Sequence, residues 1–438
     1  MVNFARLLYY LAGAMRRLYW DRDKLRKYQE KRLRAVVKYA YENVPFYHAN
    51  FREMGVKPDD VKCLDDLSKL PLIRKSELRQ VPPRQRVSRE FDIERLKVVR
   101  TSGSTGEPFT TYICGRESDW RKAIYMRANI SCGQKPRDRW VFVTAPHHFH
   151  DTTGIQRWLG IYAQTCVSVF MSADQHVEVI SRLKPDILDG YSGALFLIAK
   201  ELDRSGLRSI KPRIVFGSAD LIDATSRKFM EKVFDAPYLD QFGCAEIDRS
   251  AWQCPEKIGY HMDVDSVIME FVDENGEVVS AGERGEIVYT SLFNYAMPLI
   301  RYAVGDVGVL SNDECTCDRT LPLMEVVEGR KDSFLILPEG RLLSPMAFRN
   351  ALSKFFEKIV QYRIVQKKVN LFKVLVQLKE DVDESVFASE LVKHIRHTLG
   401  FGNDIEISVN FVDKLPPNKS GKLMSVVSEV KMDLRGRC

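Results

Sequence analysis

The segment Thr101-Ser102-Gly103-Ser104-Thr105-Gly106 combines small hydroxyl side chains with glycines, directly after an apolar run that ends at Val99. Because glycine has no Cβ, backbone N–H groups can approach phosphate oxygens closely, and the hydroxyl groups add further donors. We interpret the segment as a phosphate-binding loop, with a mobile Ser/Gly linker as the alternative. The P-loop of the common NTPases requires a Gly-Lys pair followed by Ser or Thr, with a second glycine upstream. Gly421-Lys422 does not match this pattern, because it is followed by Leu423 and lacks the upstream glycine.

Four residues with metal-ligand chemistry are spaced Cys-x6-His and then, after 53 residues, Cys-x-Cys: Cys254, His261, Cys315 and Cys317. Structural zinc sites use four thiolate and imidazole ligands in a tetrahedron. Both later cysteines lie in the polar stretch Ser311–Arg319, where a thiol is poorly placed to be buried as a small hydrophobe. We predict a structural Zn²⁺ site, with four unrelated residues as the alternative. Cys244 ranks below the four as a ligand.

A third cluster is the loop Ala145–Asp151, which holds His147, His148 and His150 together with an aspartate. Imidazole side chains change charge near neutral pH and can bind anions or metals. The loop therefore favours contact with a polar or anionic substrate, or with a metal. A loop with exposed histidines is the alternative.

Charged residues recur in glycine-containing turns further along the chain, in the segments Asp240–Glu246, Arg301–Asp306, Glu328–Asp332 and Leu415–Lys422. Each is weak alone, but their order and spacing are specific. Together with the loop at 101–106, they resemble the adenylate-forming superfamily of acyl-CoA synthetases. Within it they resemble the phenylacetate-CoA ligase-like branch, which includes capsule-cluster adenylating proteins. The resemblance runs from the first helices to Lys422 and so covers nearly the whole chain.

The resemblance implies a nucleotide site. Residues Thr101–Gly106 would hold the β- and γ-phosphates of ATP, and the adenine pocket would be lined by Ser218, Ala219 and Asp220. Gln241, Phe242 and Gly243 would belong to the same site. Phe242 stands where the family usually has a tyrosine. Phenylalanine keeps the aromatic face that can stack on the purine, but it lacks the hydroxyl group.

The resemblance also implies the charged groups of the reaction. Glu246 matches the glutamate that binds Mg²⁺, a hard cation that needs oxygen ligands. Asp306 matches the aspartate that accepts hydrogen bonds from both ribose hydroxyls, and Arg330 lies beside it in the pattern. Asp332 matches the hinge of the C-terminal domain. Lys422 matches the lysine that reaches both the substrate carboxylate and the α-phosphate.

These roles imply that a carboxylic acid attacks the α-phosphate of ATP, which gives an acyl-adenylate and pyrophosphate. In the family a thiol, usually coenzyme A, then takes the acyl group after the small domain rotates. The stretch Gly340–Pro345 replaces a more polar segment of the ligases, and no comparably specific residue points to coenzyme A. One alternative is transfer to an amine, a hydroxyl or a carrier thiol in polysaccharide or natural-product assembly. Another is a nucleotide-binding, membrane-peripheral scaffold without turnover.

The elements that must position these residues form two patterns. From about residue 92, short β-branched runs alternate with helical stretches, which is typical of an α/β sheet. Residues 264–290 favour an antiparallel hairpin with an Asn275-Gly276 turn. From about 333 the order is β-α-β-β-α-β. We predict an α/β protein with a large N-terminal adenylation domain over 1–331, of mixed sheets and helices, and a small mobile α+β C-terminal lid over 332–438.

Composition bounds the remaining possibilities. The 438 residues are 45% apolar and 29% charged, as in a folded enzyme. Residues 1–40 hold eleven basic and three acidic side chains, a balance of +8, so the rest of the chain contributes only about −1 to the net charge of +7. This concentration argues against nucleic-acid binding. Nine cysteines at irregular spacing indicate reduced thiols and a cytoplasmic location.

Two basic helices are expected at about 3–20 and 23–42. Arg16 and Arg17 interrupt the apolar stripe of the first, so we expect neither a membrane span nor a signal peptide. The helices either pack on the protein or attach loosely to an acidic membrane surface. The sequence leaves the identity of the acid and the oligomeric state open.

Overall fold

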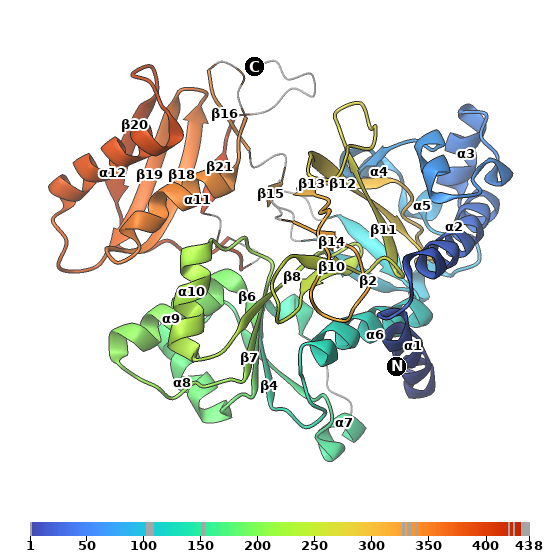
Figure 1. Ribbon diagram of the computed structural model, residues 1–438, viewed down its shortest axis with the longest axis horizontal. Coiled ribbons are helices and arrows are strands. Elements are labelled where there is room, and N and C mark those ends of the chain that lie inside the picture. Colours follow the sequence, from blue (N-terminus) through green and yellow to red (C-terminus); the bar gives the residue numbers. More distant parts are fainter. Residues whose placement is uncertain are drawn as a thin grey trace. The chain divides into compact units, whose positions relative to one another are not determined.

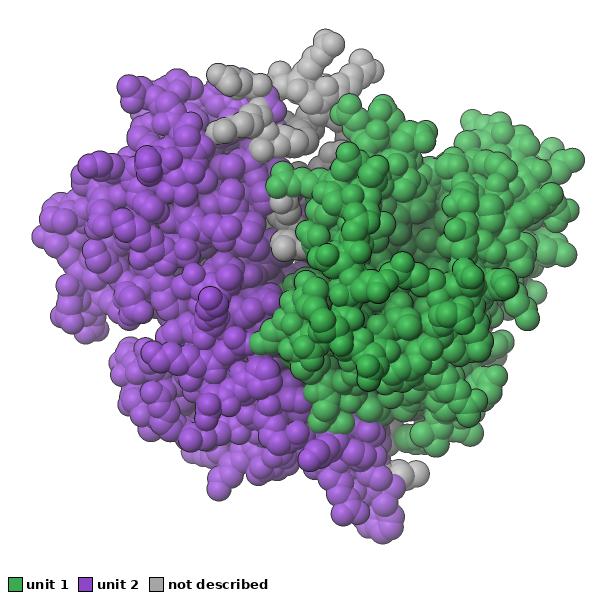
Figure 2. Space-filling view, viewed as in Figure 1, with its two compact units in different colours: residues 1–134, 239–327 green, residues 135–238, 328–438 purple. Residues whose placement is uncertain are grey.

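The protein is shown in Figure 1 as a computed structural model. It describes residues 2–101, 109–149, 154–325, 329–330, 334–338, 340, 342–418, 421–423 and 425–430. Two compact units are present, the first built from residues 1–134 and 239–327 and the second from residues 135–238 and 328–438 (Figure 2). Each unit therefore joins two stretches of chain that are far apart in the sequence.

The first unit begins with the two expected basic helices, α1 (Phe4–Arg17) and α2 (Arg22–Asn43). The side chains of Asn3 and Asp21 accept backbone N–H groups in the first turn of each helix, which fixes where the helices start. The other helices of this unit are α3 (Pro45–Glu53), α4 (Lys75–Gln80), α5 (Pro83–Arg86) and α6 (Gly115–Ser131).

Helix α1 packs on the protein through one face. Ala14 forms a buried cluster with Trp120 and Ile124 of α6, and the buried Arg17 guanidinium donates to the Asp265 carboxylate at 2.6 Å. Leu8 and Tyr9 on the opposite face are exposed. Packing thus uses much of the apolar stripe, while membrane attachment stays a prediction. Across the described residues, no helix combines the length and apolar character needed to cross a membrane.

Two sheets of the first unit carry predicted site residues. One has the order β1-β13-β12-β11, with β1 (Ile73–Arg74), β11 (Val267–Val272), β12 (Arg284–Ser291) and β13 (Tyr302–Val309). The predicted hairpin is confirmed, since β11 and β12 are antiparallel and Gly276 has φ +83°. The other contains β14 (Leu323–Met324), β10 (Tyr260–Met262), β9 (Asp248–Gln253) and β8 (Tyr238–Cys244), all paired antiparallel.

The second unit contains the predicted parallel α/β sheet. Its strand order is β7-β6-β4-β5, with β4 (Trp140–Thr144), β5 (Gln164–Ser168), β6 (Ile187–Tyr191) and β7 (Ile214–Ser218). Helices α8 (Ala173–Leu183), α9 (Ser192–Ser205) and α10 (Ala224–Phe234) follow β5, β6 and β7; α7 (Gly154–Leu159) lies between β4 and β5. Strand residues such as Val143, Leu188 and Val215 are buried in one core with Leu195 and Ile198 of α9.

The end of the chain folds as the predicted α+β pattern. A sheet of order β20-β19-β18-β21 contains β18 (Ile359–Lys368), β19 (Leu371–Leu378), β20 (Glu406–Phe411) and β21 (Val426–Ser428). The remaining elements are α11 (Pro345–Leu352), α12 (Glu384–Leu399) and the short hairpin β16 (Leu335–Ile336) and β17 (Leu342–Leu343). The expected boundary between residues 331 and 332 lies outside the described residues and stays a prediction.

Candidate active site and metal cluster

Glu246 lies in the turn between β8 and β9 and is buried, with a side chain only 1% exposed. Its Oε1 is 2.8 Å from Lys75 Nζ and accepts a hydrogen bond from the Tyr302 hydroxyl at 3.1 Å. Arg121 of α6 donates to the Glu246 carbonyl at 2.6 Å, which holds the turn itself. A buried carboxylate held in this way offers the oxygen ligands that a hard cation such as Mg²⁺ requires. The carboxylate suits the predicted role in its chemistry, and that role stays a prediction.

Asp306 is a buried residue of β13, the strand that also carries Tyr302. The carboxylates of Glu246 and Asp306 both act on the Cys244 thiol, whose pKa burial raises well above its usual value and the two negative charges raise further. The two predicted carboxylates thus lie in one region of the first unit. Cys244 belongs to this region and is not part of the Cys/His cluster described below.

The predicted phosphate loop emerges from the hairpin β2 (Lys97–Arg100) and β3 (Thr110–Ile113). Thr101 and Phe109 close the base of the loop, since the Thr101 N–H donates to the Phe109 carbonyl and the Phe109 N–H donates to Thr101 Oγ1, both at 2.9 Å. Ser102, Gly103, Ser104, Thr105 and Gly106 lie outside the described residues. The Phe109 ring stacks on Tyr302, with ring centroids 6.2 Å apart.

Strand β8 carries the remaining nucleotide-site residues of the first unit. The Gln241 amide donates to Asn129 Oδ1 at 2.9 Å, so this side chain holds β8 against α6. Phe242 is half-buried and Gly243 exposed. The register of β8 and β9 shifts between Phe242 and Gly243, and a Cβ on Gly243 would overlap the Asp248 carbonyl. Glycine is required there by the close approach of two backbones.

In the second unit, Ser218, Ala219 and Asp220 follow at the carboxyl end of β7, and Ala219 has φ +70°. The Asp220 carboxylate accepts the Gly193 N–H at 3.2 Å and also the Leu423 N–H. Burial raises the pKa of Asp220 to about 6, against the opposing attraction of Lys422 and Arg349. Asp220 therefore links the start of α9 to the segment that carries the predicted lysine.

Lys422 lies in a tight turn whose hydrogen bonds start from Asn418. The Lys422 N–H donates to Asn418 Oδ1, and the Asn418 N–H donates to the Lys422 carbonyl, both at 2.9 Å. Gly421 has φ +81°, and a Cβ there would overlap Val169, the residue after β5. The turn thus lies against the carboxyl ends of β5 and β7, the edge at which open parallel α/β sheets bind ligands.

The C-terminal segment is held on α9 by Lys200. Its ammonium group donates to the carbonyls of Ile359 and Phe356 and lies 4.4 Å from the centroid of the Phe356 ring. Burial lowers the pKa of Lys200 to about 8. Lys200 therefore contacts the C-terminal segment through both hydrogen bonds and the face of an aromatic ring.

The other predicted residues are less constrained. His147 is exposed and His148 half-buried in a short 3-10 turn, with ring centroids 4.2 Å apart. His150 and Asp332 lie outside the described residues. Arg330 belongs to the short strand β15 (Gly329–Arg330). Their roles in binding the substrate (His147, His148 and His150), in binding the nucleotide (Arg330) and as the hinge (Asp332) remain predictions.

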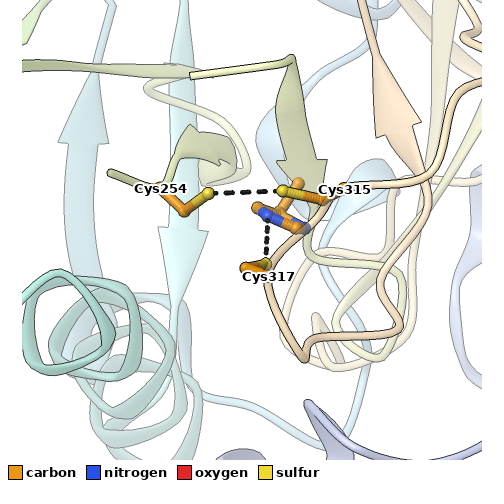
Figure 3. A group of neighbouring side chains, drawn as sticks. Cys254, Cys315 and Cys317 are labelled. Atoms are coloured by element: carbon orange, nitrogen blue, oxygen red, sulfur yellow. Dashed lines mark hydrogen bonds between the residues drawn. The ribbon is translucent and has the colours of Figure 1, made fainter. Parts of the chain in front are cut away.

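The four predicted zinc ligands meet in the first unit (Figure 3). Their ligand atoms all lie within 4.8 Å of one another. Cys254 Sγ is 3.5 Å from Cys315 Sγ, and Cys317 Sγ is 3.4 Å from His261 Nε2. Burial lowers the pKa of His261 to about 4, so the imidazole is neutral at neutral pH. The structure therefore confirms that the sequence pattern brings these residues together.

The sequence analysis missed Lys75, Tyr302 and Arg121, which surround Glu246. None belongs to a spacing pattern, and each of them contacts Glu246 from a distant part of the chain. Tyr302 alone lies within a motif that the analysis used, the segment Arg301–Asp306. Lys75 and Arg121 carry no local signal, because a lysine or arginine on a helix is by default expected to be solvated.

The comparison with known proteins identifies relatives over nearly the full length. Residues 335–429 match the family of CapK C-terminal domains. A phenylacetate-coenzyme A ligase of Pseudomonas putida is 29% identical over 407 residues, which cover 88% of this chain and 90% of the relative. A phenylacetate-coenzyme A ligase of Thermus thermophilus is 26% identical over 436 residues, covering 93% and 97%.

The structure of a 2-hydroxyisobutyryl-CoA ligase in the postadenylation state, in complex with 2-HIB-AMP, superposes with a TM-score of 0.77 at 24% identity. The match covers 91% of this chain and 88% of that one. This likeness confirms the predicted mixed α/β fold with a large N-terminal and a small C-terminal domain.

Proposed function

We propose a function from the premise that this chain belongs to the phenylacetate-CoA ligase-like family of adenylate-forming enzymes, CapK relatives included. In this proposal the chain activates a carboxylic acid with ATP and passes the acyl group to coenzyme A. The family is one of acid–CoA ligases. The observation that supports this function most is the position of the Lys422 turn at the carboxyl edge of the parallel sheet, against Asp220 and Val169.

The proposed first step is in-line attack. A carboxylate oxygen of the acid forms a bond to the α-phosphorus, the bond from that phosphorus to the bridging oxygen breaks, and pyrophosphate leaves. Negative charge builds up on the phosphate oxygens, and Lys422 would donate to them there. Mg²⁺, when bound, supplies further positive charge at the phosphates, and Glu246 would hold it. Asp306 would accept the ribose hydroxyls, and the loop at 101–106 would hold the β- and γ-phosphates.

Nucleotide contacts complete the proposed site. By the resemblance, Ser218, Ala219 and Asp220 would line the adenine pocket and Phe242 would stack on the purine. Gln241, Gly243 and Arg330 would also bind the nucleotide. Asp332 would act as the hinge that withdraws Lys422 before the second step. In that step a thiolate attacks the acyl carbonyl, the bond to the phosphate oxygen breaks and AMP leaves.

For the acid, we propose a polar or anionic compound rather than phenylacetate itself. The support is the neighbouring pair His147, which is exposed, and His148, which is half-buried, in the loop after β4. The match of residues 335–429 to the CapK C-terminal domain favours a second candidate. In that case the acyl group passes to an amine, a hydroxyl or a carrier thiol.

A mass-spectrometric screen tests both candidates. The full chain is incubated with ATP, Mg²⁺ and a panel of carboxylic acids, and acyl-adenylates are detected directly. Coenzyme A is added next, followed in separate reactions by amines, hydroxyl compounds and a carrier thiol. An acyl-CoA product supports the first function, and consumption of the adenylate only by another acceptor supports the second. The absence of any adenylate would leave a nucleotide-binding scaffold and overturn both.

A further inference from the structure

We propose that Cys254, His261, Cys315 and Cys317 bind one Zn²⁺ as a closed structural site, and that this ion holds the strand carrying Asp306 in position relative to the turn carrying Glu246. These four side chains lie in a part of the first unit that takes no direct part in the proposed chemistry.

Two ligand–ligand distances are close to those of tetrahedral coordination, and all four ligand atoms lie within 4.8 Å of one another. With Zn–S bonds of about 2.3 Å and a Zn–N bond of about 2.0–2.1 Å, two ligand atoms of a tetrahedron lie roughly 3.5–3.8 Å apart. Cys254 Sγ and Cys315 Sγ are 3.5 Å apart, and Cys317 Sγ and His261 Nε2 are 3.4 Å apart. All three thiols are free. A small inward-facing shell of this size is what one zinc ion needs.

The surroundings of the ligands also suit a metal. His261 Nδ1 lies 3.4 Å from the Leu321 carbonyl, while Nε2 faces Cys317. A carbonyl partner on one ring nitrogen leaves the lone pair of the other directed at the metal. Three thiolates and a neutral imidazole around Zn²⁺ carry a net charge of −1, and the Arg319 side chain, which hydrogen-bonds Cys317, would balance it.

The ion would connect three segments of chain. Cys254 follows β9 directly, and His261 lies in β10, opposite Trp252 of β9 and Leu323 of β14. The other two ligands lie in residues 311–322, a connection between β13 and β14 that has no helix or strand of its own.

This arrangement couples the metal to the nucleotide site. Strand β9 begins two residues after Glu246, and β13, which carries Asp306, ends just before the connection that holds Cys315 and Cys317. The ion would hold β9 at the end opposite to Glu246, through Cys254, and would hold the chain just after β13, through Cys315 and Cys317. It would therefore tie together β9, which begins next to Glu246, and β13, which carries Asp306. We expect loss of the ion to loosen both.

Metal content is the first test, because it does not depend on activity. The full chain, purified without added metal or chelator, is measured by mass spectrometry of the elements, and about one zinc ion per chain is expected. Cys315→Ser/Cys317→Ser should lose the zinc. Cys166→Ser, a change in β5 of the second unit, should retain it. Zinc well below one per chain in the wild type, or zinc retained by the double variant, would overturn the site.

A second measurement does not require a folded variant. An organomercurial that reacts with the thiols of the wild-type chain should release zinc, which a chromogenic chelator detects. The release should reach about one zinc ion per chain when the three cluster thiols have reacted. Protein in which Co²⁺ replaces zinc should show the thiolate-to-metal absorption of a tetrahedral sulfur site. Release without stoichiometric zinc, or a cobalt spectrum without thiolate absorption, would contradict the ligand set.

The coupling has its own test. In the zinc-depleted wild-type chain, the dissociation constant for ATP should rise, and re-addition of Zn²⁺ should restore it. A depleted chain that binds ATP as tightly as the zinc-bound one would overturn the coupling.

Discussion

Lys75 and Glu246 form a buried ion pair in the first unit, with Nζ and Oε1 2.8 Å apart and side chains 15% and 1% exposed. The pair brings the start of α4 against the turn after β8. Because the Glu246 carboxylate is almost fully removed from water, its negative charge depends on Lys75 and on the Tyr302 hydroxyl. The same charge is the one that the proposed site offers to Mg²⁺. Lys75 therefore holds the carboxylate in place, and its role toward Mg²⁺ stays a proposal.

Replacing Lys75 should destabilise the protein. Lys75→Met leaves a buried carboxylate without its cationic partner, and we expect the free energy of unfolding to fall by about 2–4 kcal/mol. Urea denaturation followed by circular dichroism measures the change. Lys38→Met is the matched control, since Lys38 is exposed and its ion pair with Glu42 is 3.9 Å long. A Lys75→Met loss no larger than that of Lys38→Met would show that the pair is not structurally important.

The double variant Lys75→Met/Glu246→Gln should recover part of the lost stability. Removing both charges leaves two neutral side chains of similar shape, which costs less than one unpaired buried charge. A double variant less stable than Lys75→Met would contradict this. Its adenylation activity should stay low, since the proposed Mg²⁺ ligand is gone.

Lys422→Ala should abolish most adenylation while ATP binding is nearly unchanged. The side chain is proposed to stabilise charge that develops on the α-phosphate, and losing one such donor costs on the order of 100-fold or more in rate. Acid-dependent pyrophosphate exchange measures the rate, and calorimetry measures ATP binding. The control is Lys414→Ala, an exposed lysine upstream of the turn. Equal rates for the two variants would remove Lys422 from the mechanism.

The pH dependence of stability should report Asp220. Its pKa is raised to about 6 in the folded protein, mainly by burial. The folded state therefore binds this proton more tightly than the unfolded chain, in which the carboxyl group has its ordinary pKa near 3.8. The contribution of Asp220 to stability is greatest below about pH 4, falls as the pH rises to about 6 and is constant above that.

Asp220→Asn removes this titration. The free energy of unfolding of the variant minus that of the wild type should increase between about pH 4 and pH 6 and then level off. Chemical denaturation at half-unit steps of pH measures the difference. A difference that is flat across this range, or that decreases, would show that Asp220 is not perturbed in the direction stated.

Gly421→Ala should weaken the placement of Lys422. The glycine has φ +81°, and a Cβ would meet Val169, so the backbone must shift at a cost of about 1–3 kcal/mol. We expect slower acid-dependent pyrophosphate exchange and a melting temperature that falls by a few degrees. Gly206→Ala is the control, because Gly206 also has positive φ but has open space around it and lies away from the turn. Exchange at the rate of the control would contradict the proposed docking of the turn.

The elements that the sequence predicts are those with a local cause. The alternation around Val267–Val272, the Asn275-Gly276 turn and the helix at Glu384–Leu399 each follow from periodicity or turn chemistry. The Cys/His cluster could be predicted because so few side chains have that chemistry. The short strands β17 and β21 have only two and three residues, too few for a periodic pattern.

Other features depend on contacts that no local pattern contains. Lys75 resembles any of the chain's many lysines until the fold places it beside Glu246. Likewise, the two compact units each combine distant stretches of the sequence. Which stretches make up each unit depends on tertiary packing, which no local pattern contains. The boundary expected between residues 331 and 332 stays a prediction.

The central claim is that this chain forms acyl-adenylates. The most direct measurement is ATP–pyrophosphate exchange by the purified full-length chain with Mg²⁺ and a panel of carboxylic acids, with Lys422→Ala in parallel. We predict exchange that depends on at least one acid and is lost in the variant. Neither exchange nor pyrophosphate release with any acid, from protein that binds ATP, would contradict the account.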